Sequence, residues 1–254
     1  CIQNSSPSRD SVTSVRRACG AERTLQLDGK DINWQPVLED SIHSEEECVE
    51  LHTLCTHIGI GPATGCDSLF VRTSSTSFPS SMSEFLYKTI SGAQLVPGQA
   101  TFQPQDLMLI PYIRSTSNLA AGHSDEITNA LLNIDPVTTN KRIQAVKAKK
   151  THTRGGRSDH CWYRFKDSIN LDRLLSPKIL VKDITEKPEF WVDSIGDIIP
   201  RHTVYYIIPD SDYSLKELFA FLQSDFACAW LKANSQKASG GCIRVQASVL
   251  KRVP

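Results

Sequence analysis

The chain has 254 residues, with 28 Lys and Arg against 28 Asp and Glu, and 40% of its residues are hydrophobic. This composition excludes disorder as the dominant state, because apolar residues are frequent enough to build a core. No apolar run approaches the roughly 20 residues that a membrane span requires. The sequence opens without a charged-then-apolar leader, and its eight scattered cysteines include no Cys-x-x-Cys pair. We therefore expect reduced thiols and a cytoplasmic protein, with an extracellular disulfide framework as the alternative.

The balanced net charge hides a strong asymmetry along the chain. Residues 39–50 hold six acids and no base, whereas residues 141–166 hold nine bases and one acid. After Asp225 there is no further acid, and five bases follow. Two separate basic stretches on a neutral chain favour a localised surface that binds a polyanion. The alternative is an inert, solvated surface helix followed by a basic loop.

The first half of the sequence predicts short, mixed elements. Residues 1–40 are polar and begin without Met, so we expect part of a longer protein, with a strand at 23–27. Ser44 and Glu47 form a capping box that predicts a helix to about residue 58. A strand at 68–73, a helical or mixed insert at 84–90 and an apolar run at 107–113 follow, while residues 115–156 look least structured.

The last hundred residues carry the clearest pattern. KILVKDI (178–184) and TVYYIIP (203–209) predict strands, and residues 189–193 predict a partner for the first of them. Lys178 and Lys182 alternate along this strand, which is typical of a solvated face or of a binding face. Ser214 and Glu217 form a second capping box before a predicted amphipathic helix over 214–234, and a short strand is expected at 242–245.

The segment GIGPATG (59–65) is similar to a dinucleotide fingerprint, but its spacing and its order of elements differ. That fingerprint needs a strand before the glycines and a helix N-terminus after them, whereas here a helix is predicted before and a strand after. We therefore interpret the glycines as a tight turn in which the backbone approaches another surface closely.

Other candidate chemistry is incomplete. Cys48, His52 and Cys55 would share one face of the predicted helix with His57 nearby, yet their spacing differs from structural zinc motifs, so we predict no metal. The sequence contains no Gly-x-Ser-x-Gly, His-Glu-x-x-His or phosphate-binding Gly-x-x-x-x-Gly-Lys motif. His202 could act as a base or, as is more usual at a strand start, as a structural or ligand-contacting group. No catalytic residue is assigned, which favours a binding module.

Aromatic residues interleave with cations in WYRFK (162–166). Such a mixture can hold phosphates and stack on bases. Core packing explains Trp162 and Phe165 equally well.

Together these segments resemble a family. GIGPATGCDSLFV (59–71) is similar to G-x-G-x-A-T-G-x-D-x-x-F-V of bacterial adenine-specific DNA methyltransferases. WYR, SPKILVKDI and RHTVYYI resemble W-Y-R, P-K-L-L-V-P-D-I and H-H-N-x-Y-x-I of those enzymes, and the end of the chain resembles their closing G-G-x-x-R-F-Q segment. The likeness covers residues 58–71 and 162–254, in the family's order, and residues 141–150 match poorly.

The resemblance implies the target-recognition domain of a TaqI-like or type IIG adenine-N6 methyltransferase, a bacterial defence enzyme of restriction and modification. In that family a separate N-terminal domain binds S-adenosylmethionine and carries Asn-Pro-Pro-Tyr, which is absent from this sequence. We therefore expect no cofactor and no methyl transfer in this chain itself. Its expected partners are double-stranded DNA and a methyltransferase domain of the same parent protein, with no membrane.

The expected fold is α+β, with small mixed or antiparallel sheets and packed helices in two lobes, and without a Rossmann-like catalytic domain. The expected parts are an N-terminal linker and helix (1–57), a first lobe (58–140), a basic loop (141–161) and a second lobe (162–254). The loops Pro62–Asp67 and His152–His160 are expected to contact base edges while the catalytic domain flips the adenine. The residues expected to contact DNA are Thr64, Lys149, Lys150, Arg154, Arg157, Arg164, Arg201, His202, Lys237 and Arg244.

Two alternatives belong to other classes. A protein-interaction or scaffold domain would use the same charges to dock an acidic partner without any nucleic acid. A self-sufficient hydrolase would need an active site that no motif in the sequence indicates. Salt-sensitive binding to duplex DNA separates the recognition module from the scaffold.

Overall fold

The computed structural model describes residues 2–4, 12–16, 22–26, 49–73, 78–99, 101–149 and 161–254. The chain divides into two compact units, Cys1–Val49 and Glu50–Pro254. In the first unit, β1 (Ile2–Asn4), β2 (Val12–Arg16) and β3 (Glu22–Gln26) form an antiparallel sheet in that order. The strand expected at 23–27 is confirmed as β3, within one residue.

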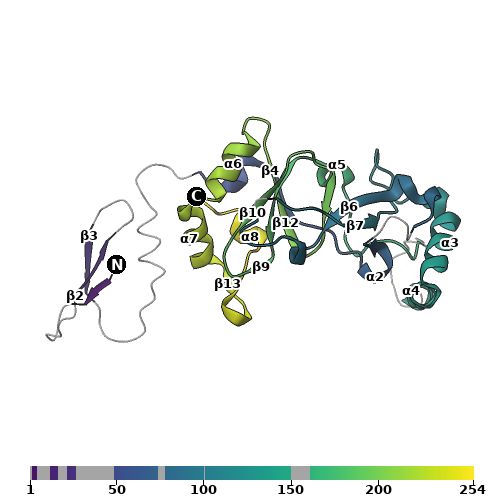
Figure 1. Ribbon diagram of the computed structural model, residues 1–254, viewed down its shortest axis with the longest axis horizontal. Helices are drawn as coiled ribbons and strands as arrows, with labels where there is room; N and C mark the ends of the chain where they lie inside the picture. Colours follow the sequence, from purple (N-terminus) through teal and green to yellow (C-terminus); the bar gives the residue numbers. More distant parts are fainter. Residues whose placement is uncertain are drawn as a thin grey trace. The chain divides into compact units, whose positions relative to one another are not determined.

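The second unit contains two four-stranded sheets and one small sheet (Figure 1). An antiparallel sheet in the order β10-β8-β12-β4 consists of β4 (Cys55–Ile60), β8 (Lys178–Lys182), β10 (Phe190–Asp193) and β12 (Val204–Pro209). A mixed sheet in the order β11-β6-β7-β5 consists of β5 (Val71–Arg72), β6 (Leu86–Ile90), β7 (Asp106–Leu109) and β11 (Ile198–Pro200), which runs parallel to β6. The small sheet, in the order β13-β14-β9, consists of β9 (Ile184–Thr185), β13 (Gln236–Lys237) and β14 (Ile243–Arg244).

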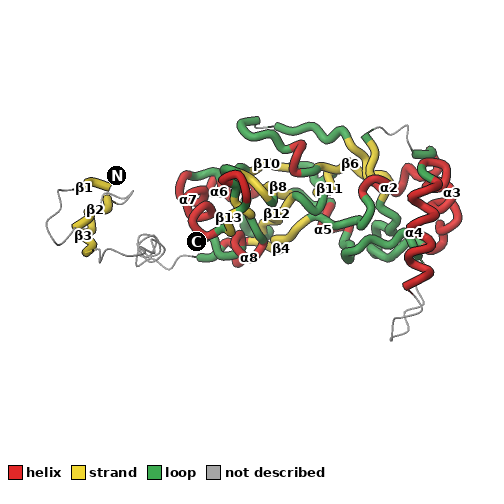
Figure 2. The backbone as a smooth tube through the Cα atoms, turned by 90° about the horizontal axis from the view of Figure 1, so that it is seen from below, coloured by secondary structure: helices red, strands yellow, loops and turns green. Residues whose placement is uncertain are grey.

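The helices gather at the two ends of this second unit (Figures 1 and 2). Beside the mixed sheet lie α2 (Asp67–Phe70), α3 (Ser124–Ile134) and α4 (Pro136–Lys149). Beside the antiparallel sheet lie α6 (Leu215–Leu222), α7 (Asp225–Asn234) and α8 (Ala247–Leu250), and α5 (Leu171–Leu174) lies between the two ends. Short 3₁₀ helices span Leu51–Leu54, Ser80–Phe85, Gly92–Gln94, Ala121–His123 and Ser239–Gly241. Among the described residues, no helix is both long and apolar enough to cross a bilayer.

The antiparallel sheet separates two hydrophobic cores. Successive side chains of a strand point to opposite faces, and β8 accordingly gives Leu180 to one core and Ile179 and Val181 to the other. This double burial explains why KILVK is continuously apolar between its two lysines. The predicted α+β class with small mixed and antiparallel sheets is therefore confirmed.

The strands cross the lobe boundaries that the sequence suggested. β4 begins before residue 58 and pairs with β12 from the C-terminal part of the chain. Conversely, β11 belongs to the C-terminal part of the chain and pairs with β6 from the first part. Residues 58–140 and 162–254 therefore do not form separate sheets, because each main sheet takes strands from both.

Several local expectations were wrong. The capping box Ser44–Glu47 of the helix predicted to reach residue 58 lies outside the described residues. The described remainder is a 3₁₀ turn followed by β4, since Leu51 donates its N–H to the Val253 carbonyl (2.7 Å) and β4 pairs along β12. The region judged least structured, 115–156, contains α3 and α4, and the basic loop expected at 141–161 is helical up to Lys149. Pro136 is the first residue of α4, which suits its fixed φ.

Three further expectations change in detail. Residues 68–73 begin as α2 before β5. The helix expected over 214–234 is two helices, because Ser224 begins α7 by accepting the Ala227 N–H (3.2 Å). The Lys178 side chain is fully buried and pairs with Asp193 (2.6 Å), so it does not lie on a solvated or binding face.

Candidate nucleic-acid interface

The glycine turn, residues 61–67, follows β4 and lies against the segment that joins the two main sheets. A Cβ at Gly61 would lie 2.2 Å from the Pro200 carbonyl oxygen and 2.4 Å from that of Arg201. Gly65 has a φ of +76°, in the left-handed region that favours glycine. The predicted tight turn with a close backbone approach is thus confirmed.

Thr64 closes this turn from inside. Its fully buried hydroxyl donates to Asp67 Oδ1 (2.6 Å) and accepts from the Cys66 N–H (2.9 Å). Expected from the sequence to contact DNA, Thr64 instead has its hydrogen-bonding capacity used within the turn. The Thr64 side chain therefore stabilises the glycine turn, and the exposed groups next to the turn belong to neighbouring residues.

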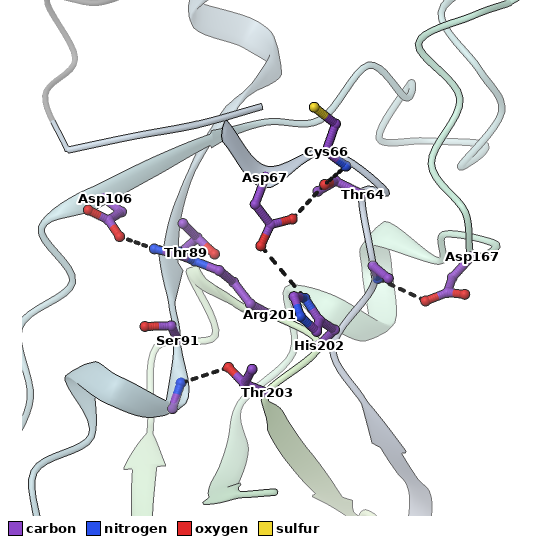
Figure 3. A network of polar contacts seen from close by, with 12 residues as sticks. Thr64, Cys66, Asp67, Thr89, Ser91, Asp106, Asp167, Arg201, His202 and Thr203 are labelled. Atoms are coloured by element: carbon purple, nitrogen blue, oxygen red, sulfur yellow. Dashed lines mark hydrogen bonds and ion pairs between the residues drawn. The ribbon is translucent and has the colours of Figure 1, made fainter. Parts of the chain in front are cut away.

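Asp67 connects the glycine turn to His202 (Figure 3). The second carboxylate oxygen of Asp67 lies 3.6 Å from His202 Nδ1, and the His202 side chain is 49% exposed against 32% for Asp67. His202 belongs to the short link between β11 and β12, which passes from the mixed sheet to the antiparallel sheet. The imidazole therefore stands at the junction of the two sheets, oriented by a less exposed carboxylate.

Arg201, next to His202, is turned inward. Its guanidinium pairs with Asp106 at the start of β7, and both side chains are largely buried. Gln94 lies within hydrogen-bonding distance of both groups, at 3.4 Å from Arg201 and 3.2 Å from Asp106. Burial lowers the pKa of the Arg201 guanidinium, and the nearby Asp67 acts in the opposite direction. The Arg201 side chain therefore pairs with Asp106 inside the protein and does not extend into solvent.

Arg244 and Lys237 lie on the neighbouring strands β14 and β13, and both are exposed. Arg244 Nε is 3.7 Å from Asp183 Oδ1, and its side chain is 45% exposed against 20% for Asp183. Burial raises the pKa of Asp183, while Arg244 and His202 lower it. The backbone of Asp183 donates its N–H to the Thr203 carbonyl (3.0 Å) and accepts the Val245 N–H (2.7 Å), so Asp183 links the small sheet to the junction.

The segment of residues 161–167 borders the glycine turn on its other side. Lys166 donates its N–H to the Ala63 carbonyl (3.0 Å), and the Asp167 carboxylate accepts the Ala63 N–H (2.8 Å). Arg164 and Lys166 are exposed, whereas the aromatic residues of WYRFK are buried. Core packing, one of the two explanations for Trp162 and Phe165, is confirmed, because Phe165 packs edge-on against Phe70 with ring centroids 5.1 Å apart.

Five of the ten residues expected to contact DNA thus lie in or beside these contacts: Thr64, Arg164, Arg201, His202 and Arg244. Lys237 lies on the adjoining strand β13, and its ammonium donates to the Lys232 carbonyl (3.2 Å). Lys149 is the last residue of α4. Lys150, Arg154 and Arg157, together with the loop 152–160, lie outside the described residues. DNA contact itself stays a prediction for all ten.

Sequence reasoning missed the carboxylates that orient these groups, Asp67, Asp167 and Asp183, and it missed Arg142, which binds the backbone of both loops. Asp67 and Asp183 stand in segments that the family resemblance covers, but nothing local shows what these carboxylates pair with, because their partners His202 and Arg244 are far away in the sequence. Asp167, likewise, is 104 residues from Ala63.

Of the four side chains considered for a metal, Cys48 lies outside the described residues, and the other three do not share one helix. His52 lies on a 3₁₀ helix, and Cys55 and His57 lie on β4, so the helical face that would have grouped them does not exist. Burial, with a smaller effect from Asp210, raises the pKa of the Cys55 thiol to about 12. Within the described residues, no three such side chains cluster.

Comparison with known proteins identifies partial homologues. No family model matches the sequence. The chain is 34% identical over 92 residues to the type II methyltransferase M.PaeR7I of Pseudomonas aeruginosa, which is 36% of this chain and 16% of that protein. It is 29% identical over 109 residues to the type II methyltransferase M.XhoI of Xanthomonas vasicola, covering 43% and 19%. The matches thus span less than a fifth of these relatives, and the resemblance to DNA methyltransferases is confirmed over part of the chain.

Solved structures share the fold more completely. The type IIL restriction-modification enzyme MmeI, solved in complex with DNA, superposes on 98% of this chain with a TM-score of 0.53 and 13% identity, over 30% of its own length. The type IIG restriction endonuclease BpuSI superposes on 93% of this chain with a TM-score of 0.51 and 13% identity, over 29% of its length. The fold is therefore one that these restriction-modification enzymes contain as a minor part.

Proposed function

We propose that this chain is the module that recognises a DNA sequence for an adenine-N6 methyltransferase of a restriction-modification system. The observation that carries the proposal is the basic set, which we define as the exposed residues Arg164, Lys166, His202, Lys237 and Arg244. This set adjoins the junction where both main sheets meet the glycine turn. The partial homologues of the chain are type II methyltransferases, and a structure with the same fold was solved with DNA bound.

The geometry suits a phosphate backbone for an electrostatic reason. In the pairs Asp67–His202 and Asp183–Arg244 the basic side chain is the more exposed partner. The carboxylates orient these side chains and leave donor groups facing solvent. Arginine and lysine contacts with phosphates release condensed counterions and supply affinity that does not depend on sequence.

Sequence preference would come from the loops beside this set. The glycine turn and the 161–167 segment present backbone and polar groups next to Arg164 and Lys166, where they can meet base edges in a groove. A separate domain of the parent protein would bind S-adenosylmethionine, flip the target adenine and transfer the methyl group. This chain then provides affinity and register for that reaction.

Duplex binding tests the proposal directly. The 254-residue chain is titrated against labelled, mixed-sequence duplex DNA at salt concentrations between about 50 and 200 mM. We expect log affinity to fall linearly with log salt, with a slope of roughly −0.9 for each phosphate contact. A selection from duplexes with a randomised centre should then recover a preferred sequence. Absence of duplex binding, or binding that ignores salt, would favour a protein-interaction domain instead.

The cofactor part of the proposal has its own test. In calorimetry the isolated chain should show no saturable binding of S-adenosylmethionine. Contrary to the order expected from sequence, a strand (β4) precedes the glycine turn and a helix (α2) follows it, but α2 is only four residues long and the flanking strands β4 and β5 pair antiparallel with β12 and β7, unlike the parallel βαβ unit of such sites. Saturable binding in the micromolar range would contradict the division of labour between two domains.

A further inference from the structure

Arg142, on α4, uses its guanidinium to bind backbone carbonyls of the two loops proposed to contact bases. Its Nη2 donates to the Thr64 carbonyl (3.0 Å) in the glycine turn and to the Arg164 carbonyl (2.8 Å) in the 161–167 segment. Its Nε donates to the Trp162 carbonyl (3.0 Å) in the same segment. A single side chain from a third element therefore holds both loops.

The surroundings of Arg142 fix its position. The guanidinium carbon lies 5.2 Å from the ring centroid of Phe70, a fully buried residue of α2, in a cation–π contact. Gly65 packs beside it, since a Cβ there would lie 3.4 Å from Nη1. Burial lowers the pKa of Arg142, while the neighbouring Cys66 thiol acts in the opposite direction.

Only a planar group with several donors fits this arrangement. Arginine presents its N–H groups in a rigid fork, so that two or more acceptors in one plane can be held at once. A lysine ammonium is a compact point charge on a flexible stem, and it would reach one loop without fixing the other. The three acceptors are carbonyls whose own residues lie 20, 22 and 78 positions away.

We propose that Arg142 is a positioning residue that fixes the glycine turn relative to the 161–167 segment and thereby sets the sequence preference of the module without contacting DNA. The inference rests on the proposed function. Its physical basis is that recognition of bases requires side chains and backbone groups held to within a fraction of an ångström. Phosphate contacts from flexible, exposed Arg and Lys side chains tolerate much larger displacements.

The test uses Arg142→Lys and Arg142→Met, with Lys141→Met as the matched control. Lys141 is the exposed neighbour of Arg142 on α4, so its removal subtracts the same charge without touching the loops. Hydrogen exchange measured on the full chain reports on the loops directly. We expect exchange in both 61–67 and 161–167 to accelerate by roughly tenfold or more in the two Arg142 variants, with β8 and the control unchanged.

The second measurement is sequence preference, obtained by selection from duplexes with a randomised centre. In the Arg142 variants we expect the affinity ratio between selected and unselected duplexes to fall by roughly tenfold or more, while the salt slope stays at the wild-type value. A slope reduced by roughly 0.9 would mean that Arg142 contacts a phosphate, and would overturn the proposal. An unchanged sequence preference would also overturn it.

The two measurements separate this inference from the function on which it rests. If the wild-type chain binds no duplex, the proposed function fails and the specificity role fails with it, while exchange still reports whether Arg142 joins the loops. If the wild type binds and selects a sequence, but exchange in the two loops is unaffected by Arg142→Met, the positioning role alone is overturned.

Discussion

The guanidinium of Arg201 pairs with the carboxylate of Asp106 at the point where the chain leaves β11 and enters β12. The N–H of Arg201 also donates to the Ile90 carbonyl (2.9 Å) at the end of β6. These contacts tie the link between the two main sheets to the mixed sheet. The next residue, His202, is exposed. The Arg201–Asp106 pair therefore holds in place the backbone that carries His202.

Replacing Arg201 by Met should therefore lower stability without removing a DNA contact. The buried Asp106 carboxylate would lose its charged partner, and breaking such a pair from one side costs about 3 kcal/mol. Urea unfolding should show this loss, and the exposed Arg252→Met should stay within about 0.5 kcal/mol of wild type. The salt slope of duplex binding should not change. A slope that flattens by roughly 0.9 would return Arg201 to the phosphate contacts expected from sequence.

Gly61→Ala tests the close approach of the glycine turn to the sheet junction. The added Cβ would lie 2.2 Å from the Pro200 carbonyl oxygen, and this neighbour is backbone that cannot swing away. Overpacking of this kind costs about 1–3 kcal/mol. Gly122→Ala is the control, because nothing lies within 4 Å of a Cβ at that position. Equal thermal unfolding midpoints for the two variants would refute the close packing.

Lys178 and Asp193 form the most deeply buried ion pair of the described residues, with side-chain exposures of 0% and 2%. Asp193 also accepts the N–H groups of Gly196 (2.9 Å) and Ile198 (3.2 Å), which shapes the turn from β10 into β11. Lys178→Met should therefore destabilise the fold by about 3–5 kcal/mol in urea unfolding.

A second variant separates the charge from the packing at this site. Lys178→Met combined with Asp193→Asn should recover part of the loss, because the double variant leaves no unpaired buried charge and the amide oxygen can still accept one of the two backbone N–H groups, which bond to different oxygens of Asp193. Lys182→Met, on the same strand but half-buried, serves as the control. Equal stability of Lys178→Met and Lys182→Met would mean that the pair does not hold the turn.

His57 predicts a pH dependence with a definite sign. Its ring packs against Tyr206 (centroids 5.1 Å apart), and its pKa is lowered by burial and further by Arg173 and Lys251. The unfolded chain, where a His titrates near about 6.5, then binds the proton more readily than the folded chain. This contribution to stability is present above the unfolded pKa and is lost as the pH falls below it.

The free energy of unfolding should accordingly decrease between about pH 7.5 and about pH 5.5, and His57→Gln should show a smaller decrease. Identical profiles for wild type and His57→Gln would show that the burial of this imidazole does not affect stability.

The strands of the C-terminal part could be predicted because their local signal agrees with their environment. KILVK and VYYIIP combine β-branched and aromatic residues with burial on both faces, and β8, β10 and β12 all form where expected. Residues 51–60 could not be predicted in this way. Their apolar spacing suits a weak helix, and the strand forms because β12, about 150 residues away, offers a pairing edge.

The candidate site shows the same limit of local patterns. Arg164, His202 and Arg244 were found from charge and family resemblance, and they are exposed. Arg201 was expected for the same reasons, yet its side chain is largely buried and pairs with Asp106, 95 residues away. Thr64 is fully buried within the glycine turn. A basic residue at a sheet junction faces solvent or a buried carboxylate depending on long-range contacts that composition does not encode.

The salt dependence of duplex binding in a triple variant tests the central claim most directly. Arg164→Gln, Lys166→Gln and Arg244→Gln remove three exposed cations of the basic set, and Lys187→Gln, Lys216→Gln and Lys251→Gln remove the same charge from other exposed positions. If the basic set holds phosphates, the first triple variant should bind any duplex more weakly, with a salt slope flattened by roughly 2–3 units, while the second keeps nearly the wild-type slope. Equal slopes for wild type and both triple variants would contradict the account.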